Sequence, residues 1–391
     1  MFQPFPLKLL ALAWLILNNR AEHVESLEPI STTIAAGFAS VVSMFFIGDG
    51  FNAIKCKTVE CCTDAWINPN FTALNDILKT RLHGQHLVRP VIVKALRAHL
   101  KNPNPQKALA LSFHGWTGTG KNFVAGLITD HLYYYGRNSQ YVHLFAATHH
   151  FPHENHIETY KDQLRDWIRG NVTVCPRSLF IFDEIDKMPS RLLDSIKPYL
   201  DYYTEINGVD YRKSMFIFLS NTVANSITQH TLAHWQSGAP RETITYKEME
   251  EVITLRSYNE KGLSAVSANW LLAQLNRNLQ RLWSYFGQTW FTAPDGRQHS
   301  FHSGGLWHSE LIQKHLITAF VPFLPLERKH VKLCIKDVLR VKNITVTTDL
   351  INKVADELQY SPGRPGLFST SGCKRVEEKV DFVVLDVENE D

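Results

Sequence analysis

Residues 109–122 read Leu-Ala-Leu-Ser-Phe-His-Gly-Trp-Thr-Gly-Thr-Gly-Lys-Asn, and this stretch decides the fold of the chain. Leu109–Phe113 is a short apolar run of the kind that forms a buried parallel strand. Gly115–Asn122 matches G-x-x-x-x-G-K-N, a phosphate-binding loop (P-loop) whose backbone N–H groups surround phosphates. Apolar residues then recur at helical spacing up to Tyr133. Taken alone the loop is open to being a chance glycine-rich turn, but strand, loop and helix in this order predict a nucleotide site.

The loop departs from the usual pattern at its last position. Lys121 is placed to reach the outer phosphates, but Asn122 stands where a Ser or Thr normally supplies a hydroxyl to Mg²⁺. The carbonyl oxygen of Asn122 can still contact the metal. The residues that we expect to bind the nucleotide are Gly115, Trp116, Thr117, Gly118, Thr119, Gly120, Lys121 and Asn122.

A second apolar strand, Ser178–Phe182, ends in two carboxylates. In P-loop NTPases an acid at the end of such a strand holds Mg²⁺, because a hard cation prefers oxygen ligands. We assign Asp183 to the metal and Glu184 to the general base that acts on the attacking water. The alternative is a strand that ends in a solvated acidic turn, which the P-loop upstream disfavours.

A third apolar strand, Met215–Ser220, is followed by Asn221. An Asn beside the γ-phosphate can help to orient the attacking water, a role called sensor 1, although a lone strand-end Asn is usually a turn residue. The three strands together predict an α/β fold with a doubly wound parallel sheet. The nucleotide is then expected at the carboxyl ends of the strands.

The composition is that of an ordinary globular protein, with 44% hydrophobic and 20% charged residues. A length of 391 residues leaves room for two or three domains. The net charge of +3 and the lack of a basic run give no case for a nucleic-acid partner.

The N-terminal region carries two apolar stretches. The first, within residues 1–24, is typical of a signal peptide, although its cleavage site is poorly defined. The second, within residues 28–48, is free of basic residues and near the lower limit of a membrane span. We expect it to associate with a membrane surface, and a buried core helix is the alternative.

Cysteines and glycosylation sequons agree with secretion. If the signal peptide is real, the compartment is oxidising and disulfides are allowed, whereas the cysteine spacing does not fit a zinc site. The six cysteines are Cys56, Cys61, Cys62, Cys175, Cys334 and Cys373. Candidate glycosylation sites are Asn70, Asn171 and Asn343, each followed by Thr at the third position.

The ordered motifs resemble those of AAA+ ATPases of the Clp type, and more narrowly the torsins of the endoplasmic reticulum lumen and nuclear envelope. The likeness runs from about residue 28 to 383, and the Asn in the P-loop favours the torsin-1 branch. Besides the P-loop, the stretches that carry it are His150–His153, Tyr160–Leu164, Trp167–Asn171, Phe180–Met188, Phe216–Asn221, Val321–Leu326 and Gly372–Lys374.

This resemblance implies ATP as the nucleotide, Mg²⁺ as the metal, and further site residues. Gly84-Gln85 matches the turn beside the adenine. Lys374 matches sensor 2, a cation that reaches the γ-phosphate from a C-terminal lid. Cys373 then lies next to the nucleotide, with Cys334 as its implied disulfide partner, which suggests a redox-sensitive site.

The resemblance also exposes a missing arginine. Clp-type ATPases carry an arginine near the end of the large domain that reaches the γ-phosphate of the neighbouring subunit, and Phe320–Pro325 contains none. Such a residue contributes about 10³–10⁵ in rate in GTPases. In torsins it comes from the lumenal domains of single-pass membrane activators of the lamina-associated polypeptide 1 type. We therefore expect slow or no hydrolysis by the chain alone, and a homo-oligomer or mixed ring.

The resemblance also implies the bounds of two domains, an insertion and a pair of acidic residues in the lid. The large AAA+ domain is predicted at residues 68–300 and a small helical lid at 303–385. Residues 262–302 form an insertion that torsins lack, either an amphipathic helix or intron sequence retained in the gene model. The lid carries Asp356-Glu357, which match paired acids near the activator contact, or belong to a solvated helix face.

The predicted function is that of a chaperone-like ATPase in protein quality control and membrane organisation. The alternative is a nucleotide-dependent binding switch that docks membrane partners, with hydrolysis as a reset.

Overall fold

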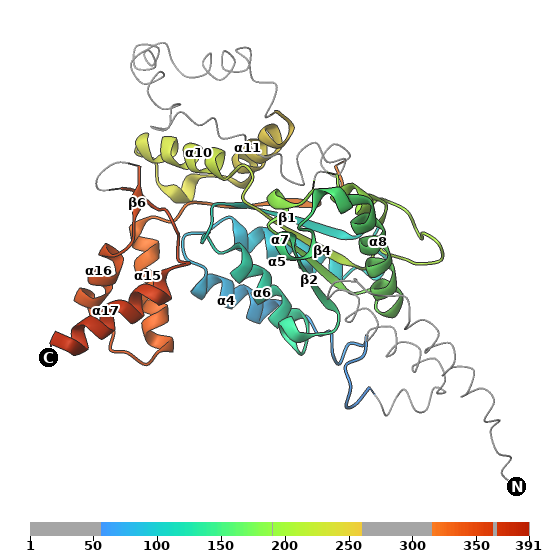
Figure 1. Cartoon of the computed structure of the whole chain (residues 1–391), viewed down its shortest axis with the longest axis horizontal. Coiled ribbons are helices and arrows are strands. Elements are labelled where there is room, and N and C mark those ends of the chain that lie inside the picture. The colour runs from blue at the N-terminus through green and yellow to red at the C-terminus, as the bar shows by residue number, and fades with distance from the viewer. Residues whose placement is uncertain (1–55, 190, 260–314, 363–365, 391) are drawn as a thin grey trace, which may run out of the picture. The chain divides into compact units, whose positions relative to one another are not determined.

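The computed structural model describes residues 56–189, 191–259, 315–362 and 366–390 (Figure 1). The predicted signal peptide, the membrane-associating segment at 28–48 and the insertion at 262–302 lie outside these residues. Residues 56–61 belong to a separate unit, in which Cys56 and Cys61 form a disulfide. Within the described part of the chain, no helix is both long and apolar enough to span a bilayer. The unit that begins at Cys62 is described below.

A five-stranded sheet forms the centre of this unit, and all its strands are parallel. Their order is β2-β3-β4-β1-β5. Two of the four neighbouring pairs, β4-β1 and β1-β5, are not consecutive along the chain, and parallel neighbours need crossover connections, as in a doubly wound fold. The strands are β1 (Leu109–Gly115), β2 (Val142–Ala146), β3 (Leu179–Asp183), β4 (Met215–Ser220) and β5 (Ala319–Phe323).

Side chains of each strand alternate between two hydrophobic cores, one on each face of the sheet. Phe180, Phe182, Phe216 and Phe218 enter the core that α8 (Ile157–Val174) covers. Their neighbours along the strands enter the opposite core, which α4 (Phe71–Arg81), α5 (Val88–Leu100) and α6 (Lys121–Leu132) cover. Both faces are therefore buried, which explains why the strands read as unbroken apolar runs.

The other helices lie around this sheet or in the lid. They are α7 (Ala147–His150), α9 (Lys197–Leu200), α10 (Ala224–Gln236), α11 (Tyr246–Asn259), α15 (Arg328–Val341), α16 (Thr348–Asp356) and α17 (Val376–Glu390). A two-stranded antiparallel ladder, β6 (Tyr360–Ser361) and β7 (Phe368–Ser369), lies between α16 and α17 along the chain.

The lid packs α15, α16 and α17 around a hydrophobic core of its own, which begins at Leu326. The predicted boundary between the domains at residue 303 is wrong, because β5 pairs with β1 in the sheet. Val321 and Phe323 are fully buried in the sheet core. β5 is an edge strand, and such a strand tolerates Pro322 because one side of its backbone needs no partner. The large domain thus extends to Leu324.

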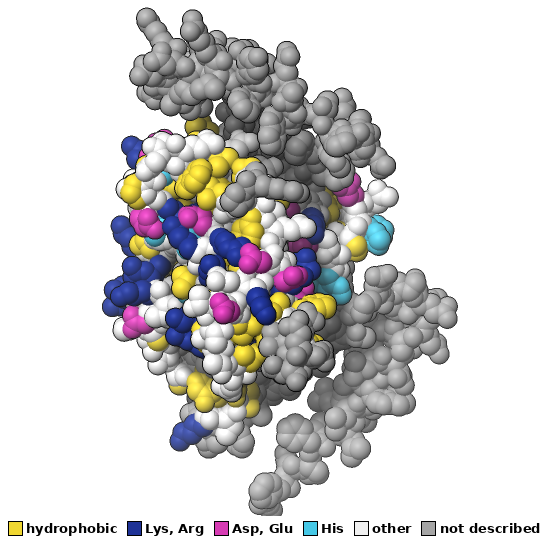
Figure 2. Space-filling model, turned by 90° about the vertical axis from the view of Figure 1, so that its left-hand side faces the viewer, with side chains coloured by type: hydrophobic (Ala, Val, Ile, Leu, Met, Phe, Trp, Pro, Cys, Tyr) yellow, Lys and Arg dark blue, Asp and Glu magenta, His cyan; other side chains and the backbone are white. Residues whose placement is uncertain are grey.

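On the face of the molecule that carries the lid, acidic and basic side chains are intermingled (Figure 2). Arg328 pairs with Asp356, and Lys379 lies 3.0 Å from Glu357. The two acids that match the family's activator contact therefore join α16 to α15 and α17 within this chain. This arrangement fits the interpretation as part of the lid's own surface.

Two disulfides lie in the unit that begins at Cys62. Cys62–Cys175 and Cys334–Cys373 are disulfides, so the bond implied for Cys334 and Cys373 is confirmed. Cys62–Cys175 joins the start of this unit to the turn before β3. Cys334–Cys373 joins α15 to the loop before α17, inside the lid.

Candidate nucleotide site

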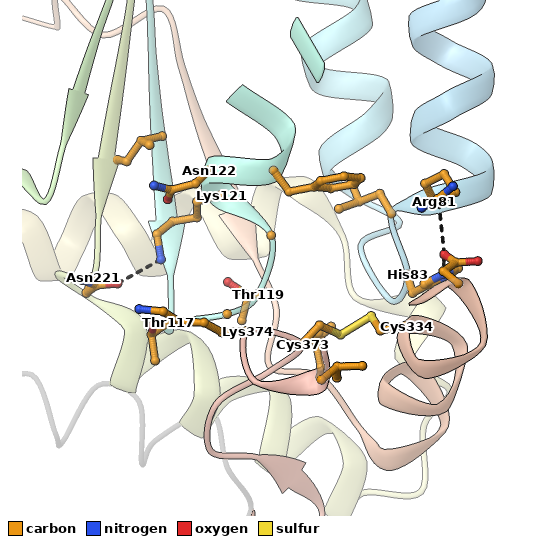
Figure 3. A pocket seen from close by; sticks show the side chains of 18 of the residues that line it. Arg81, His83, Thr117, Thr119, Lys121, Asn122, Asn221, Cys334, Cys373 and Lys374 are labelled. Carbon is orange, nitrogen blue, oxygen red and sulfur yellow. Dashed lines mark hydrogen bonds and ion pairs between the residues drawn. A yellow bond between two sulfur atoms is a disulfide. The ribbon is translucent and has the colours of Figure 1, made fainter. Parts of the chain in front are cut away.

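A cavity of about 510 Å³ lies at the carboxyl ends of the strands, between the large domain and the lid (Figure 3). Residues Thr117–Phe123 of the P-loop and α6 line one wall. Gly115 and Trp116 are not in the lining; Gly115 ends β1, and the Trp116 indole donates to the Thr370 carbonyl in the lid, 2.9 Å away. The structure thus brings six of the eight predicted loop residues to the cavity.

Lys121 is 7% exposed, and its ammonium group makes three contacts (Figure 3). It donates to the carbonyl oxygens of Gly115 (2.7 Å) and Trp116 (3.0 Å), and to Oδ1 of Asn221 (2.9 Å). Burial lowers its pKa from 10.5 to about 8, although the nearby charges of Asp186 and Asp183 act in the opposite direction. A phosphate oxygen must replace at least one of these acceptors, and its negative charge stabilises the ammonium form.

Asp183 and Asn122 lie together, as a shared metal site requires. The Asn122 amide nitrogen donates to Oδ2 of Asp183 at 2.6 Å, so its carbonyl oxygen is the atom left to face a metal. Oδ1 of Asp183 accepts the backbone N–H of Glu184 at 2.9 Å. A carboxylate and an amide oxygen at the phosphate end of a cavity are the hard ligands that Mg²⁺ takes alongside water and phosphate. These residues therefore fit the metal that the resemblance implies.

Glu184 lines the cavity and has a left-handed backbone, with φ 55°. Such a conformation is costly for a residue other than glycine and is concentrated at functional sites. One carboxylate oxygen lies 2.7 Å from Nζ of Lys187, and the other accepts the Thr148 hydroxyl at 3.3 Å. The general base predicted from sequence is thus held by two partners that the sequence motifs did not indicate.

Asn221 is oriented by Asp186, a residue in the short helix η3 (Ile185–Lys187). Oδ1 of Asp186 accepts the Asn221 backbone N–H at 2.9 Å and lies 3.5 Å from the Asn221 amide nitrogen. The amide oxygen of Asn221 in turn accepts from Lys121. Asp186, Asn221 and Lys121 form a continuous polar chain along the strand ends. In the sequence, only the position of Asp186 two residues after Glu184 hints that it belongs to the site.

The lid supplies the wall opposite the P-loop (Figure 3). The backbone N–H of Cys373 donates to the Gly118 carbonyl at 3.0 Å. A Cβ on Gly118 would lie 1.8 Å from the Ser371 carbonyl oxygen, so only glycine allows this approach of lid and P-loop. Both cysteines of the lid disulfide line the cavity. Lys374 lines it too and is exposed, with no carboxylate paired to it among the residues that the structure describes.

Arg81 and His83 lie at the end of the cavity away from Asn221, here named the nucleoside end (Figure 3). Apolar side chains that suit a nucleoside also line the cavity, Leu82 from the large domain and Val338 and Val376 from the lid. Arg81 is the only arginine in the lining formed by the described residues, and it is 3.3 Å from Asp337 of α15. No arginine thus faces the P-loop from within this part of the chain.

Comparison with known proteins agrees with this geometry. The family model described as Torsin matches residues 56–182, and the one described as Torsin-1A, C-terminal domain, matches 326–383. A Torsin-like protein of Caenorhabditis elegans is 40% identical over 332 residues, which cover 84% of this chain and 82% of that protein.

The chain belongs to the torsin family.

Solved structures of Hsp104 are similar at a lower level. An S. cerevisiae Hsp104-ADP complex matches 82% of the chain with 13% identity and a TM-score of 0.46. A closed-state complex of Hsp104 with ATPyS and FITC casein matches 81% with 14% identity and the same TM-score. The chain spans about half of each Hsp104 chain, 48% and 47%. The assignment to the torsins does not depend on these matches.

As a torsin, the protein is an AAA+ ATPase, and the predicted fold class is confirmed: a doubly wound parallel sheet followed by a helical lid. Membership in this family implies a nucleotide and Mg²⁺ in general terms. The cavity described above is the place where the family motifs and the lid meet.

The adenine turn of this torsin differs from the prediction. Gln85 is 4% exposed, and its amide is fully used by backbone groups. Its nitrogen donates to the carbonyls of Thr119 (3.0 Å) and Leu324 (2.8 Å), and its oxygen accepts from the Leu324 N–H (2.9 Å). Arg81, Leu82 and His83 line the cavity instead of Gly84-Gln85. Gln85 thus connects the P-loop to the segment that leads into the lid.

The predicted glycosylation sites of this torsin differ in geometry. Asn70 is exposed and caps the start of α4, and Asn343 is exposed in a turn with φ 56°. Asn171 lies inside α8, and its amide nitrogen donates to the Trp167 carbonyl at 2.7 Å. Glycosylation at all three sequons stays a prediction.

Proposed function

We propose that this chain hydrolyses ATP in the lumen of the endoplasmic reticulum and the perinuclear space, and does so at a useful rate when a membrane-anchored activator supplies an arginine. Its own residues support nucleotide binding, metal binding and activation of water. The proposed role is that of a chaperone-like ATPase in protein quality control and membrane organisation.

The reaction assigns a distinct task to each side chain. Lys121 and the P-loop N–H groups bind the β- and γ-phosphates, and Lys374 contacts the γ-phosphate from the lid. Mg²⁺, held through Asn122 and Asp183, would offset the charge that develops on the phosphate oxygens. Asn221 orients the attacking water, and Glu184 accepts a proton from it as the water oxygen bonds to the γ-phosphorus. The bond between the γ-phosphorus and the β,γ-bridging oxygen breaks, which releases ADP and phosphate.

The observation that carries the proposal is the distribution of arginine around the cavity. Arg81 lies at the nucleoside end and is paired with Asp337, so it does not serve the γ-phosphate. Clp-type relatives carry their arginine near the end of the large domain. The corresponding stretch of this chain, Phe320–Pro325, spans part of β5 and the residues after it and contains no arginine. An arginine from outside the chain would complete the site.

The compartment and partners follow from other features. The cysteines at 56, 61, 62, 175, 334 and 373 form three disulfides, which persist in oxidising compartments such as the lumen. The proposed partners are lumenal domains of activators of the lamina-associated polypeptide 1 type, within a homo-oligomer or mixed ring. Residues 28–48 are proposed to contact the membrane surface.

One observation favours the alternative, a slow nucleotide-dependent switch. The carboxylate of Glu184 is engaged by Lys187 at 2.7 Å and by Thr148 at 3.3 Å. A base held in this way has to be freed before it acts. In that case ATP binding docks the partner, and rare hydrolysis resets it.

Steady-state ATPase measurements with the purified lumenal chain, alone and with an activator's lumenal domain, test the proposal. We expect negligible turnover alone and a rise of about 10³–10⁵ with the activator, the contribution of such an arginine in GTPases. The matched control is an activator domain in which the arginines that could reach the ATP site are replaced by alanine. It should bind the chain without stimulating ATP hydrolysis. Appreciable turnover by the chain alone would contradict the dependence on an external arginine. Tight ATP-dependent docking without stimulated turnover would favour the switch.

A further inference from the structure

The short loop between α4 and α5 contacts the lid at two separate places. Gly84 takes part in the first, beside His330 near the start of α15, and Arg81, the last residue of α4, forms the second with His83 and Asp337, farther along the same helix. His330 and Asp337 are seven residues apart, about 10 Å along the helix for a rise of 1.5 Å per residue. They differ in burial, and this difference indicates which one can open.

The first contact is rigid. Arg241, 5% exposed at its side chain, donates to the Gly84 carbonyl at 2.8 Å and lies 3.4 Å from Glu327. Glu327 caps α15 together with His330, and a Cβ on Gly84 would lie 2.8 Å from the His330 ring. Removing a buried charge from its partner is costly, so we take this end of the helix as the fixed pivot.

The second contact lines the cavity itself (Figure 3). Oδ2 of Asp337 is 2.7 Å from Nε2 of His83 and 3.3 Å from Nε of Arg81. The exposed fractions of the side chains are 16% for Asp337, 12% for His83 and 40% for Arg81. These three residues, here named the Asp337 cluster, join the large domain to the lid across the nucleoside end. Water can replace each contact if the lid moves, because the cluster is only partly buried.

The phosphate end of the cavity contains no comparable side-chain bridge to the lid in the described residues. There the lid touches the P-loop through backbone groups and through the Trp116 indole. Parting the Asp337 cluster would let the lid move away from the part of the cavity that Leu82 and Val338 line.

We propose that the Asp337 cluster holds the lid closed over the nucleoside and sets the rate at which nucleotide leaves. Asp337 is a positioning residue, since it acts by holding Arg81 and His83 against α15. This inference rests on the proposed nucleotide binding of the same cavity. It concerns release of nucleotide, which is a separate property from hydrolysis at the phosphate end.

The test measures dissociation of a fluorescent ADP analogue, mant-ADP, from the full lumenal chain by stopped flow. In Asp337→Asn we expect dissociation about tenfold faster, the size typical of a partly shielded ion pair with a charged hydrogen bond, while association changes little. A defect in folding would lower the fraction of chains that bind mant-ADP, but it would not selectively change the rate at which bound mant-ADP dissociates. Asp381→Asn is the matched control, because Asp381 pairs with Lys342 on the lid surface.

Single changes on the other side of the cluster sharpen the test. Arg81→Gln and His83→Gln should each raise the dissociation rate by less than Asp337→Asn. Adding either to Asp337→Asn should have little further effect, because the shared partner is already lost. If Asp337→Asn does not fold, as judged by thermal unfolding, the Arg81→Gln and His83→Gln chains carry the test alone.

The outcomes separate the two proposals. If the wild-type chain binds no ATP or ADP, the proposed function and this inference both fall. If it binds, but the cluster variants release mant-ADP at the wild-type rate, the cluster has no such role and the proposed function stands. Equal acceleration in Asp381→Asn would also overturn the inference.

Discussion

The two ends of the cavity are built in different ways. At the phosphate end, Lys121, Asp183 and Asn221 come from consecutive motifs at the carboxyl ends of adjacent strands. At the nucleoside end, Arg81 and His83 meet Asp337 across 254 residues or more of sequence. The phosphate end is formed by the strand ends of the sheet, whereas the contacts at the nucleoside end form because the lid packs against Arg81 and His83.

The two ends therefore have different proposed roles: the phosphate end acts in ATP hydrolysis, and the nucleoside end sets how long the nucleotide stays bound. In the proposed function, the phosphate end carries the groups that act on the γ-phosphate, so changes there should alter turnover and leave lid closure intact. The nucleoside end carries no group near the reacting atoms, so changes there should alter how long nucleotide stays. Each prediction below places a change at one end and measures both properties.

The largest effect is expected for Glu184→Gln. Loss of the general base should lower activator-stimulated turnover by about 10²–10⁴ while nucleotide binding is retained. The variant should therefore accumulate as an ATP-bound complex with the activator, which pull-down and single-turnover hydrolysis measure. Glu158→Gln, in an exposed ion pair on α8, is the control. Equal capture of activator by wild type and variant would show that Glu184 is not the base.

A smaller loss is expected for Asp186→Asn. Asp186 orients Asn221 through two contacts, so the variant should lower stimulated turnover by about ten- to a hundredfold, as misplacement of a positioning group does. The rate of mant-ADP release should stay near wild type. Asp166→Asn, in an exposed pair with Arg169, serves for comparison. A faster release without a loss of turnover would contradict the separation of the two ends.

The pH dependence of ATP affinity depends on Lys121, whose pKa is lowered to about 8 by burial. Bound phosphate stabilises the ammonium form, so the pKa is higher in the complex and binding takes up protons above pH 8. Affinity should be flat below about pH 8 and then fall by up to about tenfold per pH unit. Titration calorimetry in buffers of different ionisation enthalpy measures both quantities. Lys121→Arg keeps its charge at these pH values, so any residual binding should lose this dependence.

The smallest effect on nucleotide is expected from removing the lid disulfide. Cys334→Ser with Cys373→Ser should lower the free energy of unfolding by about 2–4 kcal/mol and speed mant-ADP release a few-fold. The disulfide forms part of the cavity wall, so its loss loosens the nucleoside end. Cys62→Ser with Cys175→Ser is the matched control: that bond closes a longer loop away from the cavity, and should affect stability without affecting release.

The sequence predicted β1, β3 and β4 and the motifs at their ends, because each is a local pattern of apolar residues followed by polar ones. It missed β2, and it missed β5, whose short run with Pro322 looks like a loop until β1 is beside it. It also missed Asp186 and Lys187, since nothing in their spacing shows that they touch Asn221 and Glu184. The assignment of Gln85 to the adenine turn failed because a buried amide needs partners, and backbone groups were nearest.

The sequence by itself determined that this chain has a P-loop, an acidic strand end, a strand-end Asn and no arginine at the end of the large domain. These are properties of contiguous residues, whereas the order of the strands in the sheet, β2-β3-β4-β1-β5, differs from their order along the chain. Only the tertiary structure decided which side chains hold those groups in place, and that Arg81 and His83 face Asp337. Such contacts depend on where the lid packs, and that is set by the burial of three hydrophobic helices and not by any local pattern.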